Sequence, residues 1–190
     1  MEKQYVVNLF AGPGAGKSYN ALFVAGRLKK AGYCTELAEE WIKDKVYEKA
    51  PYPFTDQIYT FAKQRKKIMM RLGDKNIQFI VTDSPILLSA IYMKEPDILF
   101  EKLILREFNK MNSINFFIER SDKRAYEQSG RLHDVLQARK IDAAIKDYLD
   151  NNEVPYLSVL SDENSDQVIF NAITRRIDLA QNNGSRRSIA

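Results

Sequence analysis

The chain has 190 residues, of which 45% are hydrophobic and 28% are charged, and its formal net charge is +4. This composition is ordinary for a globular protein, and no apolar run approaches the ~20 residues that cross a bilayer. We therefore expect a cytoplasmic protein with no membrane association and one main domain over residues 1–181. The first apolar stretch is short and contains Asn8, which argues against a secretory leader. The single Cys34 excludes a disulfide framework and is expected to be a buried thiol within a strand.

Five short apolar runs alternate with helical patterns along the chain. The expected strands are residues 5–10, 33–38, 77–82, 114–118 and 154–159. The expected helices are residues 17–31, 55–72, 85–93, 97–111, 132–149 and 167–180, followed by a flexible tail over 182–190. This alternation predicts an α/β fold in which helices cover both faces of a parallel sheet.

Residues 11–18, Ala-Gly-Pro-Gly-Ala-Gly-Lys-Ser, separate the first expected strand from the first expected helix. Apart from Ala11, they match the phosphate-binding pattern G-x-x-x-x-G-K-S/T. The glycines let successive backbone N–H groups point at phosphate oxygens, and the helix that follows adds its positive end. Lys17 would reach the β- and γ-phosphates, and Ser18 would bind Mg²⁺. We assign the ATP site to Gly12, Pro13, Gly14, Ala15, Gly16, Lys17, Ser18 and Tyr19.

Acidic residues follow two of the expected strands. Asp83 comes directly after the third strand, and beside the phosphate-loop strand it would lie next to Ser18 and hold Mg²⁺ or its waters. Alternatively, Asp83 or Ser84 caps the helix expected from residue 85. Glu39 or Glu40, after the second strand, would take the proton of an attacking hydroxyl, or would simply favour the first turn of a helix.

The segment 39–73 is longer than a strand-to-strand crossover requires, and we interpret it as a substrate-binding insertion. Trp41 would form a wall of the pocket or belong to the core. On the helix expected at 55–72, polar groups gather beside an aromatic ring and would read a base or ribose. The alternative is an ordinary amphipathic face with long polar side chains reaching solvent. These substrate candidates are Gln57, Phe61, Gln64 and Arg65.

A basic segment, residues 120–131, begins at the end of the fourth expected strand. Cations on a closing lid would stabilise the negative charge of phosphoryl transfer and exclude water. Arg120, Arg124 and Arg131 are therefore lid candidates, although charges at this spacing also occur on solvated helix faces.

These motifs resemble the P-loop kinases of nucleosides and nucleotides, especially the ribosylnicotinamide-kinase-like proteins and related small phage P-loop proteins labelled as ATPases. The stretches that carry the resemblance are residues 12–18, 39–41, 56–65, 81–85, 129–131 and 154–156. The resemblance implies a three-layer P-loop NTPase fold with sheet order 2-3-1-4-5, a lid Arg-x-x-x-Arg at Arg120 and Arg124, and a carboxylate base at Glu39 or Glu40.

Deoxyribonucleoside kinases are a second likeness. They too have an acid with a nearby tryptophan after the second strand, and a Gln-x-Tyr in the substrate helix that Gln57 and Tyr59 match. Here Trp41 follows the acid directly where a proline is expected, and the third strand ends Thr-Asp-Ser-Pro where that family has Glu-Arg-Ser. The identity of the substrate is therefore not carried across.

We expect an ATP- and Mg²⁺-dependent phosphotransferase that acts on a nucleoside or nucleotide. One alternative is a kinase for a modified base or an end within DNA, which the net positive charge and the arginines support. Another is a P-loop ATPase or nucleotide-binding regulatory module without a small-molecule acceptor. The choice of ATP or GTP and the oligomeric state, a homodimer included, stay open, and a phage-encoded protein would act in the host cytoplasm.

Overall fold

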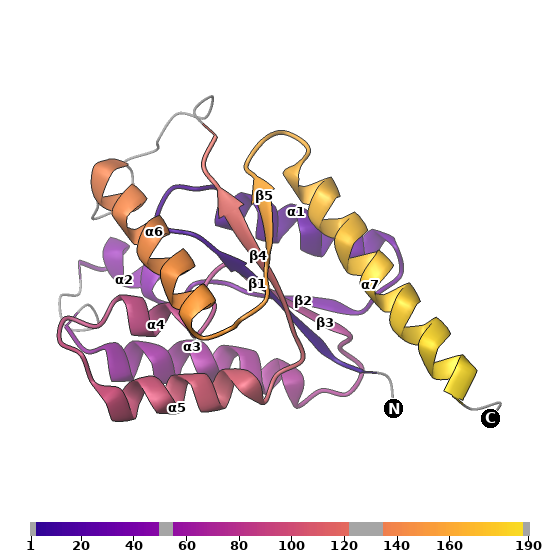
Figure 1. The fold of residues 1–190 in the computed structure, drawn as a ribbon, viewed down its shortest axis with the longest axis horizontal. Coiled ribbons are helices and arrows are strands. Elements are labelled where there is room, and N and C mark those ends of the chain that lie inside the picture. The colour runs from indigo at the N-terminus through magenta and orange to yellow at the C-terminus, as the bar shows by residue number, and fades with distance from the viewer. Residues whose placement is uncertain (1–2, 50–54, 122–134, 188–190) are drawn as a thin grey trace.

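A computed structural model describes residues 3–49, 55–121 and 135–187 of the chain. Five parallel strands form one sheet in the order β2-β3-β1-β4-β5, as predicted (Figure 1). Their bounds are β1 Tyr5–Phe10, β2 Thr35–Ala38, β3 Phe79–Thr82, β4 Ser113–Glu119 and β5 Leu157–Leu160. Because β1 lies between β3 and β4, the loop that follows β1 emerges at the centre of the sheet.

Helices cover both faces of the sheet (Figure 1). Their bounds are α1 Lys17–Lys30, α2 Ile42–Tyr47, α3 Gln57–Leu72, α4 Leu88–Ile91, α5 Ile98–Asn109, α6 Val135–Asn151 and α7 Ser165–Arg187. Side chains of β1 alternate between two cores, as the period of an extended strand requires. Val7 and Leu9 pack with α1 and α7, whereas Val6 and Phe10 pack with α3, α5 and α6.

Local signals in the sequence set several helix ends. Gly32, at a φ of +92°, lets the chain leave α1 in a left-handed conformation. The Asp56 carboxylate accepts a hydrogen bond from Tyr59 N at 2.8 Å and caps α3. The Asp97 carboxylate caps α5 in the same way, through Leu99 N and Phe100 N.

Three expectations about the elements are wrong. Cys34 is exposed and precedes β2, which begins at Thr35. The helix expected at 85–93 is only the single turn of α4. The last helix runs to Arg187, so residues 182–187 of the expected flexible tail are helical. No proline interrupts that stretch, and Gly184 alone costs a helix only about 1 kcal/mol.

Within the described ranges, every helix is too short or too polar to serve as a lipid-spanning segment.

Candidate functional site

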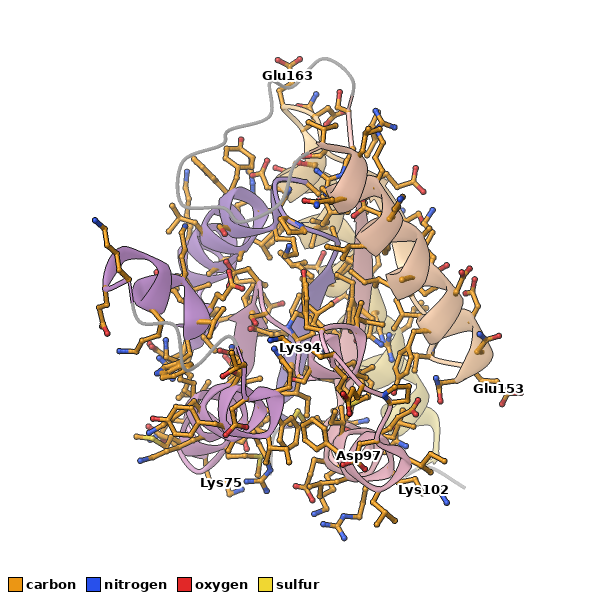
Figure 2. All side chains as sticks on the ribbon, turned by 90° about the vertical axis from the view of Figure 1, so that its left-hand side faces the viewer. Lys75, Lys94, Asp97, Lys102, Glu153 and Glu163 are labelled. Carbon is orange, nitrogen blue, oxygen red and sulfur yellow. The ribbon has the colours of Figure 1, made fainter. Side chains whose placement is uncertain are left out.

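The segments that follow β1, β2, β3 and β4 all lie at the carboxyl edge of the sheet, where open α/β sheets bind ligands. Glu163, which follows β5, marks this end of the molecule in Figure 2, and Lys75, which precedes β3, marks the opposite end. The strand order therefore brings together candidate residues that are far apart in the sequence.

The phosphate loop uses its glycines for two different reasons. Gly14 and Gly16 have positive φ angles of 76° and 96°, a region that other residues rarely adopt. Gly16 is also the N-cap of α1, whose first turn contains no acid, so the positive end of that helix is free to attract an anion. Gly12 has no positive φ, and a Cβ there would lie 2.7 Å from Ala138 O on α6. Gly12 thus makes room for α6, contrary to the expected role in curving the backbone.

Lys17 lies against its own loop. Its Nζ donates to the carbonyl oxygens of Ala11 and Gly12, each at 2.8 Å. Burial lowers the pKa of Lys17, while the nearby carboxylates of Glu40 and Asp83 act in the opposite direction. The ammonium is therefore held at the loop beside two acidic groups.

Ser18 and Asp83 are in direct contact. Ser18 Oγ donates to Asp83 Oδ2 at 2.6 Å, and Asp83 Oδ1 accepts from the backbone N of Glu40 at 3.0 Å. Asp83 is only 5% exposed. The alternative role of Asp83 or Ser84 as a helix cap is wrong, since α4 begins later, after Leu87, and has no side-chain cap.

The oxygen atoms of Ser18 and Asp83 suit Mg²⁺, which prefers oxygen ligands and keeps several waters. The described residues contain no group of three or more histidine, cysteine or acidic side chains suited to a metal. A site with few protein ligands is what a nucleotide-bound Mg²⁺ needs, because phosphate oxygens supply others.

Glu39 and Glu40 differ in their surroundings. The side chain of Glu39 is exposed, and its backbone carbonyl accepts a hydrogen bond from Lys67 Nζ at 3.2 Å. Burial raises the pKa of Glu40, with Asp83 adding to the effect and Lys17 opposing it. Glu40 therefore lies close enough to Lys17 and Asp83 for their charges to act on it, while the Glu39 side chain is exposed.

Trp41 is half-buried next to Glu40. Its backbone N donates to Gln64 Oε1 at 2.9 Å, and its ring packs edge-on against Tyr59 with 5.4 Å between centroids. The ammonium of Lys45 lies 5.6 Å from the Trp41 ring centroid. The Trp41 ring therefore contacts Tyr59 and Lys45, and its role as a wall of a substrate pocket stays a prediction.

Three of the candidate substrate residues on α3 have partners inside the protein. Phe61 is 4% exposed and packs edge-on against Phe100. Gln64 is 3% exposed and, besides contacting Trp41, donates to Thr82 Oγ1 at 3.4 Å. Arg65 donates to Glu107 Oε2 from Nε at 2.9 Å and from Nη2 at 2.6 Å. These three side chains are therefore engaged within the protein, and Gln64 does not reach solvent as the amphipathic-face alternative expected. Gln57 is half-buried at the start of α3 and stays a candidate.

Arg120, a predicted lid residue, contacts the backbone of the phosphate loop. Its guanidinium forms an ion pair with Asp142 on α6, and its Nη2 donates to Pro13 O at 2.5 Å. Asp142 Oδ1 also accepts from Gly12 N at 2.6 Å. The other two lid candidates, Arg124 and Arg131, lie outside the described residues.

Sequence reasoning missed Asp142, although a signal was present. The buried positions of α6 are Ala138, Ile145 and Leu149, and Asp142 falls on the same face at helical spacing. An acid within an apolar stripe implies a buried partner.

Solved structures with the same fold include two kinases. Thymidylate kinase from Ehrlichia chaffeensis matches with a TM-score of 0.60 and 10% identity, over 92% of this chain and 99% of that chain. Deoxyadenosine kinase from M. mycoides with bound dATP matches with a TM-score of 0.57 and 20% identity, over 89% of this chain and 98% of that chain. At these identities the likeness is one of fold.

No curated protein matches the sequence. The family described as an AAA domain, in contrast, matches residues 6–165, which is most of the chain. The matched region includes the phosphate loop, both acids of the site and Asp142, and the chain therefore belongs to the AAA domain family.

Proposed function

We propose that this protein transfers the γ-phosphate of ATP to a hydroxyl or phosphate group of a nucleoside-like acceptor. The observation that carries the proposal is the convergence on Asp83: one oxygen accepts from Ser18 in the phosphate loop, and the other accepts from the backbone N of Glu40. A single carboxylate thus links the loop that would hold the donor to the acid that would activate the acceptor.

The donor side follows from the loop geometry. The backbone N–H groups between Gly14 and Ser18 and the positive end of α1 would bind the phosphates. Lys17 would exchange its two carbonyl partners for oxygens of the β- and γ-phosphates. Ser18 and Asp83 would hold Mg²⁺, which when bound neutralises charge on the same phosphates.

The acceptor side centres on Glu40. Its raised pKa makes its carboxylate a stronger base than an exposed glutamate. When the acceptor is a hydroxyl, its proton passes to Glu40 as the new O–P bond forms, the bond between the γ-phosphorus and the bridging oxygen breaks, and ADP leaves; an ionised phosphate acceptor attacks without giving up a proton. Trp41 and Gln57 are our candidates for contacts with the acceptor, and Arg124 and Arg131 are those for cations that balance the charge of transfer.

The nucleoside class of the acceptor is supported by the shared fold of the thymidylate and deoxyadenosine kinases. Because fold alone does not fix a substrate, the acceptor screen begins with thymidylate and deoxyadenosine and extends to other nucleosides, nucleotides and oligonucleotides.

The test is uptake of labelled γ-phosphate from ATP in the presence of Mg²⁺ and each acceptor. We expect wild-type protein to label one acceptor class and Lys17→Ala to lose at least about 100-fold in rate, because Lys17 stabilises the charge of transfer. Full activity of Lys17→Ala would refute the proposal. ATP loss that no acceptor accelerates would identify a nucleotide-binding module instead, and labelling of oligonucleotides alone would identify a DNA kinase.

A further inference from the structure

Asp142 and Arg120 form a partly buried ion pair between α6 and the end of β4. Their side chains are 16% and 12% exposed, respectively. Each also contacts the backbone of the phosphate loop: Asp142 Oδ1 accepts from Gly12 N at 2.6 Å, and Arg120 Nη2 donates to Pro13 O at 2.5 Å. The pair therefore holds two consecutive residues of the loop, one through its donor and one through its acceptor.

This arrangement leaves little freedom at the start of the loop. A Cβ on Gly12 would lie 2.9 Å from Asp142 Oδ1 and 3.1 Å from Arg120 Nη2. Since the N–H group of Gly12 is bound to α6, it is directed at Asp142 and not at a phosphate. The first part of the loop is thus anchored from the side, and the part from Gly14 onward is left to bind the anion.

The charge of Asp142 requires an explanation, because an acid beside a polyanion site opposes binding. Asp142 lies against the start of the phosphate loop, where its Oδ1 accepts from Gly12 N, and Arg120 contacts both Asp142 and the carbonyl oxygen of Pro13. Partly buried charges interact more strongly than exposed ones, because water screens them less. With Arg120 in place the two charges cancel locally, whereas without Arg120 the carboxylate would repel an incoming triphosphate.

We propose that Arg120 and Asp142 are a positioning pair, in which Asp142 fixes the Gly12–Pro13 segment and Arg120 promotes nucleotide binding by neutralising Asp142, without contacting the transferred phosphate. This inference rests on the proposed function in one respect, namely that the loop binds a nucleoside triphosphate. Arg120 was expected from the sequence to be a lid cation that stabilises the transferred phosphate, and the inference assigns it a positioning role instead.

A double-mutant cycle distinguishes the two roles. The measurement is calorimetric affinity for ADP and ATP with Mg²⁺ in wild type, Arg120→Ala, Asp142→Asn and the double variant. Removing one partner of a partly buried pair leaves the other charge uncompensated, so we expect Arg120→Ala to weaken binding by about 30-fold. The amide oxygen that Asp142→Asn introduces still accepts from Gly12 N without a charge, so we expect the double variant to recover to within about fivefold of Asp142→Asn. A double variant as weak as Arg120→Ala would overturn the proposal, because a direct phosphate contact cannot be restored at Asp142.

The chain offers a matched control on the same two elements. Lys146 on α6 pairs with Glu119 on β4 at 2.8 Å, with side chains 38% and 41% exposed, and neither touches the phosphate loop in the contacts described. We expect Lys146→Ala to change nucleotide affinity by less than about twofold, because exposed pairs contribute little. A loss equal to that of Arg120→Ala would attribute the effect to general loosening of α6 and would overturn the specific role of the pair.

Two further measurements test the inference if Arg120→Ala does not fold or if the protein does not bind ADP or ATP. Arg120→Lys keeps the charge but not the planar fork, so it serves where Arg120→Ala does not fold. We expect it to bind nucleotide within about fivefold of wild type, and a loss of about 30-fold would overturn the proposal.

The Gly12 amide proton, observed by NMR without nucleotide, should lie downfield in wild type and in Asp142→Asn and move upfield in Asp142→Ala. If wild type bound neither ADP nor ATP, the proposed function would fail. The Gly12 resonance would still show whether Asp142 binds the Gly12 N–H group. An unchanged Gly12 resonance in Asp142→Ala would overturn the anchoring directly.

Discussion

Glu39 and Glu40 are neighbours in the sequence, but only Glu40 lies beside the phosphate loop. We expect Glu40→Gln to lower kcat by about 100-fold or more, because a positioned general base contributes on that order. Glu39→Gln is the matched control and should keep wild-type kcat, since the Glu39 side chain is exposed. Steady-state kinetics with the identified acceptor measure both. Equal losses in the two variants would show that the position of Glu40 near Lys17 and Asp83 is not what selects the base.

The direction of the Glu40 pKa shift also predicts a pH dependence. Burial raises its pKa above the ordinary value of 4.5, so wild-type kcat should fall as the pH decreases through the raised pKa. The same shift means that the protonated form is favoured in the folded protein. Relative to Glu40→Gln, wild type should therefore lose stability as pH rises from about 4.5 through the folded-state pKa. Urea unfolding of both proteins across this range measures the difference, and a difference that does not change with pH would contradict the assignment.

Two glycines in adjacent segments should respond oppositely to alanine. Gly12→Ala places a methyl group 2.7 Å from Ala138 O, a backbone atom, and should lower the free energy of unfolding by about 1–3 kcal/mol. Gly26 lies within α1 and has no atom within 4 Å of an added Cβ, so Gly26→Ala should raise that free energy by about 0.5–1 kcal/mol. Urea titrations with unchanged slope measure both. A stable Gly12→Ala protein would mean that α6 can move away from the loop at little cost.

At the scale of elements, an ion-pair cluster joins α3 to α5. Glu107 on α5 is 4% exposed and accepts hydrogen bonds from Arg65 on α3 and from Lys110. The bonds from Lys110 and Arg65 lower the pKa of Glu107 from 4.5 to about 2. Because the folded-state pKa is depressed, this contribution to stability is complete above pH 4.5 and is lost as the pH falls toward 2.

Glu107→Gln should therefore destabilise the protein by about 1–2 kcal/mol at pH 7, a figure reduced for water around the partly exposed Arg65 and Lys110. The loss should shrink as the pH is lowered from 4.5 toward 2. Glu36→Gln is the control. Glu36 forms an exposed ion pair with Lys29, with 3.4 Å between Oε1 and Nζ, and this pair should contribute less than about 0.5 kcal/mol to stability. Chemical unfolding as a function of pH tests the cluster, and a loss that persists at low pH would point to packing and not to charge.

Most of the elements could be predicted from the sequence because their signals are local. Alternating apolar runs gave the strands, and Asp56, Asp97 and Gly32 mark helix ends by their own chemistry. The strand order came from a family resemblance, since pairing across the sheet is not a local property. The position of Cys34 was predicted wrongly because strand ends are uncertain by a residue or two in the sequence, and Cys34 lies just before β2. The end of α7 was predicted wrongly because no proline marks where the helix stops.

The site could be predicted as far as its residues follow strands directly. Ser18 and Asp83 were expected to meet, and they do so because β1 and β3 are neighbours. The partners of Arg65 and Arg120 could not be predicted, since Glu107 and Asp142 lie on other helices whose packing brings them close. The role of an arginine near a predicted site therefore cannot be assigned before its acidic partner is known, as Arg65 and Arg120 both illustrate.

At the scale of the whole molecule, four segments from separate parts of the chain form one site, so ligand binding should stabilise the entire fold. A ligand bound only by the folded state raises the free energy of unfolding, by about 2.7 kcal/mol at a concentration 100 times its Kd. For a chain of this size that corresponds to a rise in Tm of about 5–10 °C with ATP and Mg²⁺. Lys17→Ala should show little rise, and chelation of Mg²⁺ with EDTA should reduce the wild-type shift, because Ser18 and Asp83 act through the metal. Thermal unfolding measures all three. A full shift in Lys17→Ala would place the nucleotide away from the loop and would separate ATP binding from the site built on Asp83.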